Sequence, residues 1–325
     1  MQSLVTAADA DSNVDWILSV ANLEMLPVDL LALGRKGAIN FHDGPLPKYA
    51  GLNAPVWALL NSETRHGITW HLIEGGIDEG RIVAQETFDI RPSETAFSLN
   101  TRCFEAGVQS FSRVLDAIEN GAQNAEAQDL SQRSYFGLAK RPENHGFIDH
   151  THIAAEAVRL VRALDHGPYW NPLCTAKLRI GSNVLHIGSA ELDAFPSTRA
   201  GEVLALGEDT LTLGFSDGAV RFTGVTGDLA SVSIGDMAAL QTLSTNAAAH
   251  LGRAAKEDAF WRNRLQELQP CALPLEQVST ASGWNIHEIE TAHTEFLAEA
   301  LSVLAKQMTG APCDIAFGVE PETPL

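Results

Sequence analysis

The segment from residue 37 to residue 47 places an apolar strand directly before a loop that no regular structure can continue. Residues 38–41 are mostly apolar, and Asn40 and His42 stand two positions apart, so on an extended chain both side chains leave the same face. Residues 43–47, Asp-Gly-Pro-Leu-Pro, contain a glycine and two prolines, which prevent both a helix and a sheet ladder. Because ligands on open α/β sheets bind beyond the carboxyl ends of strands, we expect a polar site here.

A second strand and a second loop supply a carboxylate for this site. Residues 67–73 alternate in the manner of a strand, and residues 75–80, Gly-Gly-Ile-Asp-Glu-Gly, end it. Asp78 in this loop can orient the imidazole of His42 and stabilise its cation, which general acid–base catalysis requires. Asn40 can donate an amide N–H to a developing oxyanion. Each residue alone is common as a loop cap or a hydrogen-bonded side chain, but together with both loops they indicate a catalytic site.

These residues carry a resemblance to a known family. The sequence resembles the folate-dependent formyltransferases, whose pattern is Asn-x-His, a Leu-Pro-x-x-x-Gly loop and a later Asp in a glycine-rich loop. The matching residues are Asn40-Phe41-His42, Leu46-Pro47 with Gly51, and Asp78. Within the family, the segment FHDGPLPKYAGLNAPVWAL is most similar to the formyltransferase domains at the start of nonribosomal peptide synthetases. The resemblance to the family extends from about Val14 to about Thr226.

The resemblance implies a reaction and a set of site residues. The family transfers a formyl group from 10-formyltetrahydrofolate to a primary amine and needs no metal. It implies that Asn40, His42 and Asp78 are catalytic. The expected folate contacts lie in the loop after the first strand and in the loop before Asp78: Asn22, Leu23, Glu24, Met25, Leu26, Ile73, Gly75 and Ile77.

Composition narrows the class of protein. The 325 residues are 45% hydrophobic and 19% charged, which is ordinary for a globular protein. No apolar run is long enough to cross a membrane and no signal region is evident at the start, so we expect a cytoplasmic protein. The four cysteines lie far apart, without the spacing of a zinc site or a disulfide framework. A net charge of −19 argues against a nucleic-acid partner.

The order of predicted elements gives an α/β fold with further parts behind it. We expect a doubly wound, mostly parallel sheet in a catalytic domain over residues 1–123, a linker over 124–150, a small oligonucleotide-binding-type (OB-like) β-barrel over 151–240 and a helical tail over 241–325. In the first domain the patterns predict strands at 14–21, 37–41, 67–73 and 82–90 and helices at 28–33, 53–60 and 93–120, with Ser93 as the cap of the last. Behind it they predict a helix at 153–164, strands at 175–180, 184–187, 201–205, 210–215 and 219–223, and helices at 246–268 and 295–308.

The charge of residues 151–240 and the sequence of the tail over 241–325 indicate which kind of molecule accepts the formyl group. Residues 151–240 hold six basic and ten acidic side chains, a net charge of −4, whereas a transfer-RNA acceptor would need a basic face on the barrel. We therefore expect a small amine or an amino acid carried on a carrier protein. The tail resembles the stretch that leads into adenylation or condensation modules, so such a downstream module is an expected partner.

Two other functions remain open at this point. One is hydrolysis of 10-formyltetrahydrofolate, with water in place of the amine, and product analysis without an acceptor separates it from transfer. The other is an inactive linker or docking domain of a synthetase, which folate binding measured by calorimetry separates from an enzyme. The family's domain begins with further strand and helix units before Val14, and this chain has no room for them.

The expected absence of strands before residue 14 leads to a prediction about self-association. The strand at 14–21 is apolar enough to be buried on both faces, so one edge would lie open without a preceding strand. We expect residues 1–325 expressed alone to be self-associated or poorly soluble, and restoration of roughly sixty upstream residues to give a folate-binding monomer or dimer. Size-exclusion chromatography with light scattering checks this. A monodisperse, active monomer of residues 1–325 would contradict it.

Overall fold

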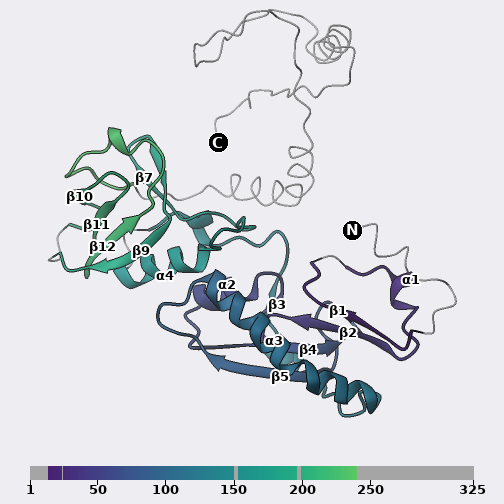
Figure 1. Cartoon of the computed structure of the whole chain (residues 1–325). Helices are drawn as coiled ribbons and strands as arrows, with labels where there is room; N and C mark the ends of the chain where they lie inside the picture. The colour runs from purple at the N-terminus through teal and green to yellow at the C-terminus, as the bar shows by residue number, and fades with distance from the viewer. Residues whose placement is uncertain (1–13, 24, 150–152, 196–198, 240–325) are drawn as a thin grey trace, which may run out of the picture. The chain divides into compact units, whose positions relative to one another are not determined.

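The computed structural model describes residues 14–23, 25–149, 153–195 and 199–239 (Figure 1). The first part is a four-stranded sheet with helices beside it. The strands, which have the same order in space as in sequence, are β1 (Trp16–Ser19), β2 (Gly37–His42), β4 (Arg65–Leu72) and β5 (Ile82–Asp89). The predicted strands of this part and the α/β class are confirmed.

The direction of the strands differs from the prediction of a mostly parallel sheet. β1 and β2 are parallel, but β2 pairs with β4 antiparallel, and β4 pairs with β5 antiparallel. The described sheet is therefore mixed. For β4 and β5 the reason is their connection, a loop too short for a crossover helix, which forces β5 to return antiparallel beside β4.

The two faces of the sheet have different characters because strand side chains alternate. Ile39 and Phe41 of β2 join Trp70 of β4 in an apolar cluster with Cys103 and Val114 of helix α3 (Ala96–Glu119). In Figure 1 the helix α3 runs along this sheet beside β4 and β5. The other face carries polar side chains, and it is the face of the site.

Helix α3 begins two residues later than Ser93 would place it. Its cap is Thr95, whose side chain accepts a hydrogen bond from Ser98 N (3.2 Å), while Ser98 Oγ accepts from Thr95 N (2.9 Å). This reciprocal capping box satisfies two N–H groups at the helix start, and Ser93 makes no such pair in the structure. The sequence offers several Ser and Thr candidates here, and only the local backbone geometry selects one.

Two shorter helices and a small strand pair complete the first part. Helix α1 spans Val28–Leu31 and helix α2 spans Ala54–Leu60, with a proline in its first turn as predicted. Asn53 stands at the start of α2 in a left-handed conformation (φ 59°) and makes no side-chain cap. Strand β3 (Ala50–Gly51) pairs in parallel with β6 (Tyr135–Phe136), which lies inside the stretch predicted as a linker. That stretch also holds two 3₁₀ turns, Leu130–Gln132 and Glu143–Gly146.

Between residues 153 and 239, the described residues form one α-helix and six strands. Helix α4 (Ala154–Leu164) confirms the predicted helix, and β9 is a strand that the sequence reading missed. The strands are β7 (Lys177–Ile180), β8 (Asn183–His186), β9 (Ser189–Asp193), β10 (Val203–Leu206), β11 (Leu211–Phe215) and β12 (Gly218–Thr223). A 3₁₀ turn at Leu229–Ser231 follows.

These strands pair as a four-stranded antiparallel sheet in the order β10-β11-β12-β9 and a separate β7–β8 hairpin. Isolated β-bridges connect the hairpin to other segments, for example His186 of β8 to Thr226, which follows β12. A closed barrel is not established by these pairings, so the OB-like barrel stays a prediction. The sequence did not predict β9 because its segment contains the acidic residues Glu191 and Asp193 on either side of an exposed Leu192, a pattern typical of a polar turn.

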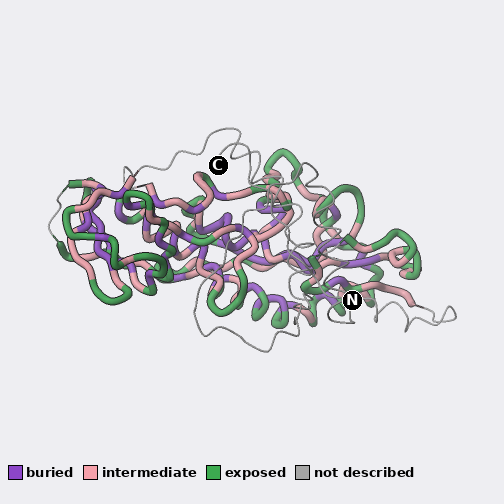
Figure 2. Tube along the Cα trace, turned by 90° about the horizontal axis from the view of Figure 1, so that it is seen from above, coloured by how far each residue is buried: buried purple, intermediate pink, exposed green. Residues whose placement is uncertain are grey.

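One large buried cluster joins α2 and α4 to the strands β7 to β12, and it includes Trp57, Val161 and Phe222. Figure 2 shows the buried residues concentrated inside, with exposed residues in the outer turns. The predicted helices at 246–268 and 295–308 lie outside the described residues. Within the described part, no helix is both long enough and apolar enough to cross a membrane.

Strand β1 is less buried than its sequence predicts. It forms one edge of the described sheet, where Leu18 is 38% exposed and the following Val20 is 51% exposed. The prediction of burial on both faces is therefore wrong for this structure, because among the described strands β1 has a neighbour, β2, on only one side.

Gly107 of α3 faces the sheet at close range, which leads to a prediction about stability. A Cβ at this position would lie 2.6 Å from the ring of Phe41, which is itself held between Trp70 and Phe104. Replacement of a helix glycine by alanine ordinarily stabilises by about 0.5–1 kcal/mol. We expect Gly107→Ala to destabilise instead, by about 1–3 kcal/mol, through overpacking.

Urea unfolding of Gly107→Ala and of Val108→Ala, a change at a 78% exposed neighbour, measures this effect. Val108→Ala should stay within about 0.5 kcal/mol of the wild type. A Gly107→Ala protein that is more stable than the wild type would show that Phe41 can move aside.

Candidate active site

The strand pairing brings three polar side chains together on one face of the sheet. Asn40 and His42 lie two residues apart on β2, and Asn40 stands directly opposite His71 of β4. His42 is 5% exposed and His71 is 3% exposed. Since directly opposed side chains on one face are neighbours, the register alone assembles partly buried Asn40 and buried His71 into a polar pair.

Asp78 closes over this face from the loop between β4 and β5. Its backbone is left-handed (φ 56°), a conformation that Asp adopts more readily than most residues. The loop folds back tightly, so that a Cβ on Gly80 would lie 1.7 Å from the carbonyl oxygen of Leu72. As a result, Asp78 Oδ2 accepts a hydrogen bond from Gly51 N at 2.7 Å, and the carboxylate faces both buried histidines.

The carboxylate of Asp78 is held in its charged form. Burial alone would raise its pKa, but the ring of His71 at 3.4 Å, the charge of His42 and the N–H of Gly51 together lower the pKa of Asp78 below its usual value. The side chain therefore stays ionised at neutral pH. A buried carboxylate between two imidazoles is suited to hold a proton on either ring.

The two ring nitrogens of His42 have different surroundings: one makes a hydrogen bond and the other faces two carboxylates. Its Nε2 donates to the carbonyl oxygen of Tyr49 at 2.8 Å, so this nitrogen carries a hydrogen. Its Nδ1 lies 3.7 Å from Asp78 Oδ2 and 3.9 Å from Asp43 Oδ1. These distances are longer than a direct hydrogen bond, so the carboxylates act on the ring through charge. Asp43 is a second carboxylate that the sequence reading treated only as a loop residue.

His71 is the site residue that sequence reasoning missed. Its Nδ1 donates to the carbonyl oxygen of Leu72 (2.9 Å), while its Nε2 lies 3.2 Å from Asn40 Nδ2 and 3.4 Å from Asp78 Oδ1. It therefore contacts two of the three predicted catalytic residues. The alternation of residues 67–73 was the available signal, because pairing of that strand with β2 puts His71 on the same face as Asn40.

The loop after β2 is held against the same face by polar contacts. Thr69 Oγ1 donates to Gly44 O (2.8 Å) and accepts from Leu46 N (3.0 Å), and Gln85 Nε2 donates to Leu46 O (2.8 Å). A Cβ on Gly44 would lie 2.8 Å from His42 Nε2. A glycine is therefore needed at this position for the imidazole to keep its place.

The predicted folate contacts fall into two described groups. In the first loop Leu23 and Met25 are 82% and 83% exposed, Asn22 and Leu26 are partly buried, and Glu24 lies outside the described residues. In the second loop Ile77 is 44% exposed, Gly75 has a positive φ (73°), and Ile73 lines a cavity of about 270 Å³ beside Trp16 and Ala122. Whether both groups surround one ligand stays a prediction.

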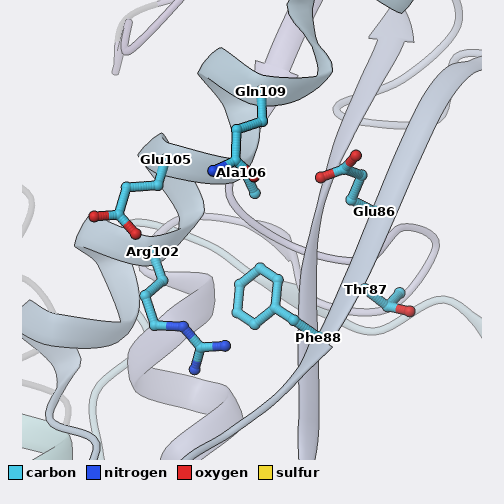
Figure 3. A pocket seen from close by; sticks show the side chains of 7 residues that line it. All are labelled: Glu86, Thr87, Phe88, Arg102, Glu105, Ala106 and Gln109. Carbon is cyan, nitrogen blue, oxygen red and sulfur yellow. The ribbon is translucent and has the colours of Figure 1, made fainter.

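A larger depression lies elsewhere and contains none of the catalytic candidates. It measures about 450 Å³ and lies between β5 and α3, where Figure 3 shows Phe88 facing Arg102. Arg102 is already engaged, since it donates to Glu94 Oε2 (2.6 Å) and Asp89 O (2.9 Å) and lies over the Phe88 ring. Within the described ranges, no cluster of His, Cys, Asp and Glu has the composition of a metal site.

Comparison with known proteins identifies the family. Residues 2–115 match the family model described as formyl transferase. The methionyl-tRNA formyltransferase of Geobacter metallireducens is 30% identical over 217 residues, which are 67% of this chain and 67% of the relative. The chain belongs to the formyltransferase family. The prediction of a folate-dependent formyltransferase, and with it of an enzyme, is confirmed at the level of the family.

Other formyltransferases and related structures agree in fold. The methionyl-tRNA formyltransferase of Trichlorobacter lovleyi is 34% identical over 154 residues, so the chain spans about half the length of that relative (48%). HypX from Aquifex aeolicus, solved in complex with tetrahydrofolic acid, has a TM-score of 0.54 at 22% identity, covering 66% of this chain and 36% of HypX. WlaRD, a sugar 3N-formyl transferase solved with dTDP and 5-N-formyl-THF, has a TM-score of 0.51 at 21% identity, with coverages of 66% and 75%.

Tyr49, whose carbonyl accepts from His42, generates a prediction about alkaline stability. Its hydroxyl donates to Glu63 (2.8 Å) and accepts from Asn61 (3.2 Å). Burial raises the pKa of Tyr49 from 10.0 to about 12, to which Glu63 adds and which Asn61 opposes. Because the folded pKa lies above the unfolded one, this stabilisation is complete below pH 10 and declines as the pH rises to about 12.

We expect the free energy of unfolding of the wild type to fall more steeply over this range than that of Tyr49→Phe, whose side chain cannot titrate. Urea unfolding of both proteins at a series of pH values measures the difference, and groups common to both cancel. Equal slopes would show that Tyr49 titrates normally in the folded state.

Proposed function

We propose that this chain transfers a formyl group from 10-formyltetrahydrofolate to a primary amine. The observation that carries the proposal is the convergence of Asn40 and His42 from strand β2 with Asp78 from the loop after β4 on one polar sheet face, with 3.7 Å between His42 Nδ1 and Asp78 Oδ2. These residue types match the needs of acyl transfer, which are a proton acceptor, an orienting charge and an oxyanion donor.

In this reaction the amine nitrogen bonds to the formyl carbon, and the bond between that carbon and N10 of the folate breaks. His42 receives the proton that the amine loses and returns a proton toward the departing nitrogen. Asp78, ionised and 12% exposed in its side chain, stabilises the imidazolium form between these transfers. Asn40 supplies a neutral N–H for the oxyanion once its amide turns from His71.

Exposed apolar side chains in the two predicted folate loops fit the ring of a folate co-substrate. The faces of the flat pterin ring can pack on apolar side chains that are not already buried in the protein, and Leu23, Met25 and Ile77 are exposed in the structure. Family membership and the tetrahydrofolic acid bound to HypX support this choice. The formyl carbon is the electrophile that the co-substrate supplies, and no step above requires a metal.

For the acceptor we propose an amino acid or other small amine, including one presented on a carrier protein of a peptide synthetase. The net charge of −4 over residues 151–240 supports a small acceptor over a nucleic acid, and Tyr169 and Trp170 add exposed aromatic rather than basic surface. Methionyl-tRNA is the second candidate, because two relatives of this chain are methionyl-tRNA formyltransferases.

Two further functions are separated from transfer by simple measurements. Formate release without an acceptor would indicate hydrolysis of 10-formyltetrahydrofolate. Absence of folate binding by calorimetry would indicate an inactive docking domain. A panel of free amino acids, aminosugars, carrier-bound amino acids and methionyl-tRNA, with mass spectrometry of the products, identifies the acceptor and rejects the small-amine proposal if only the tRNA is formylated.

Substitution of the acid–base pair tests the mechanism. We expect Asp78→Asn to lower kcat/KM by at least about a hundredfold and to leave the fold unchanged, because the amide is isosteric but uncharged. His42→Ala should lose activity to a similar extent while folate still binds. Tetrahydrofolate release and isothermal calorimetry measure the two properties.

The matched control is Asp89→Asn, which changes an 88% exposed carboxylate at the end of β5 and should stay within about twofold of the wild type. A fully active Asp78→Asn enzyme would refute the role of Asp78. Loss of folate binding in His42→Ala would place His42 in the folate site instead.

A further inference from the structure

The segment 126–136, which we call the strap, lies in the stretch predicted as a linker but is bonded to both loops of the site. It starts at Glu126, which exchanges two main-chain hydrogen bonds with Ile82 at the start of β5 (2.7 and 2.9 Å). It ends at β6, which pairs with β3 in the loop after β2. Both ends of the strap are thus attached to elements that carry the site.

The first half of the strap holds the loop of Asp78. Gln128 Nε2 donates to the carbonyl oxygens of Asp78 (2.9 Å) and Gly80 (2.6 Å). Arg133 donates to the carbonyl oxygen of Ile77 (2.9 Å). Among the described residues, no main-chain donor pairs with these three carbonyls, so the two strap side chains fix the backbone on both sides of Asp78.

The second half of the strap holds the loop after β2. Ser134 Oγ accepts from Tyr49 N (2.8 Å), and the carbonyl oxygen of Ser134 accepts from Ala50 N (2.9 Å). The carbonyl oxygen of Phe136 accepts from Leu52 N (2.8 Å). The strap therefore occupies the backbone donors on both sides of Gly51.

These contacts converge on the catalytic pair. Tyr49 O receives the hydrogen bond from His42 Nε2, and Gly51 N donates to Asp78 Oδ2. The strap holds the backbone that positions His42 with one half and the backbone that positions Asp78 with the other. The separation between the imidazole and the carboxylate thus depends on the strap.

We propose that Gln128 and Ser134 are positioning residues that set the geometry between His42 and Asp78, and this proposal rests on the proposed function. Gln128 acts as a double donor: its Oε1 is buried without a hydrogen-bond partner in the described structure, so its N–H groups alone make its contacts. An isosteric acid at position 128 would have no hydrogen to give and would face two carbonyl oxygens.

The experiment compares Gln128→Ala, Gln128→Glu and Ser134→Ala with Gln132→Ala. Gln132 is an exposed glutamine of the same strap whose side chain bonds only to Ser131 (3.4 Å) in the described structure. We expect the three strap variants to lower kcat at least about tenfold with the KM for folate within about threefold, since misplacement of reacting groups reduces turnover. Gln132→Ala should equal the wild type.

A second readout does not depend on activity. Hydrogen exchange at the amide of Gly51 should accelerate by at least about tenfold in the strap variants, because its bond to Asp78 is no longer held in place. Absence of formyl transfer by the wild type would refute the proposed function, while exchange at Gly51 would still decide the role of the strap.

The proposal would be overturned if Gln128→Glu or Ser134→Ala kept both the kcat and the Gly51 exchange rate of the wild type. It would also be overturned if Gln132→Ala lowered kcat as much as the three strap variants do. If one substitution prevents folding, the other decides, because each acts on a different loop.

Discussion

The hydrogen bond from Gly51 N to Asp78 Oδ2, 2.7 Å long, is the contact on which the site depends. It joins the loop after β2 to the loop after β4, two segments that the sheet alone would leave free to separate. Asp78 is left-handed and Gly51 has a φ of 100°, so both partners adopt backbones that few side chains favour. Such conformations persist only where surrounding contacts determine them, and here those contacts come from the sheet face, Gln128 and Ser134.

Because side chains alternate along each strand, one face of the sheet packs against α3 and the other face carries the polar residues of the site. On one face Ile39, Phe41 and Trp70 pack against α3, and their burial anchors β2 and β4 in register. A shift of one residue would move these side chains to the polar face and bury Asn40 and His42 against α3 instead. The apolar face therefore fixes the register, and the register in turn places Asn40 opposite His71. Stability and site geometry arise from the same alternation.

The electrostatics of the site follow from this enclosure. Two buried imidazoles and one N–H hold Asp78 charged although burial opposes the charge, which is the balance that an orienting carboxylate needs. Polar contacts lead from His42 Nε2 to the carbonyl oxygen of Tyr49, and two residues along the chain Gly51 N donates to Asp78 Oδ2. On the other side of Asp78, Oδ1 lies 3.4 Å from His71 Nε2, which in turn is 3.2 Å from Asn40 Nδ2. The site is therefore one connected network, in which the effect of any single residue depends on its neighbours.

The sequence by itself determined the local parts of this molecule. The shared face of Asn40 and His42, the end of β2 just before Asp43-Gly44-Pro45, the course of α3 and most of the strands follow from periodicity and from glycine and proline, which act over a few residues. The combined motifs, Asn40-Phe41-His42, Leu46-Pro47 with Gly51, and Asp78, were likewise sufficient for the family. Tertiary structure alone decided the antiparallel direction of β4, the part taken by His71 and the contacts of the strap. These depend on strand register and on loops that meet far from one another in the chain, and no local pattern encodes which backbone carbonyl a distant glutamine will reach.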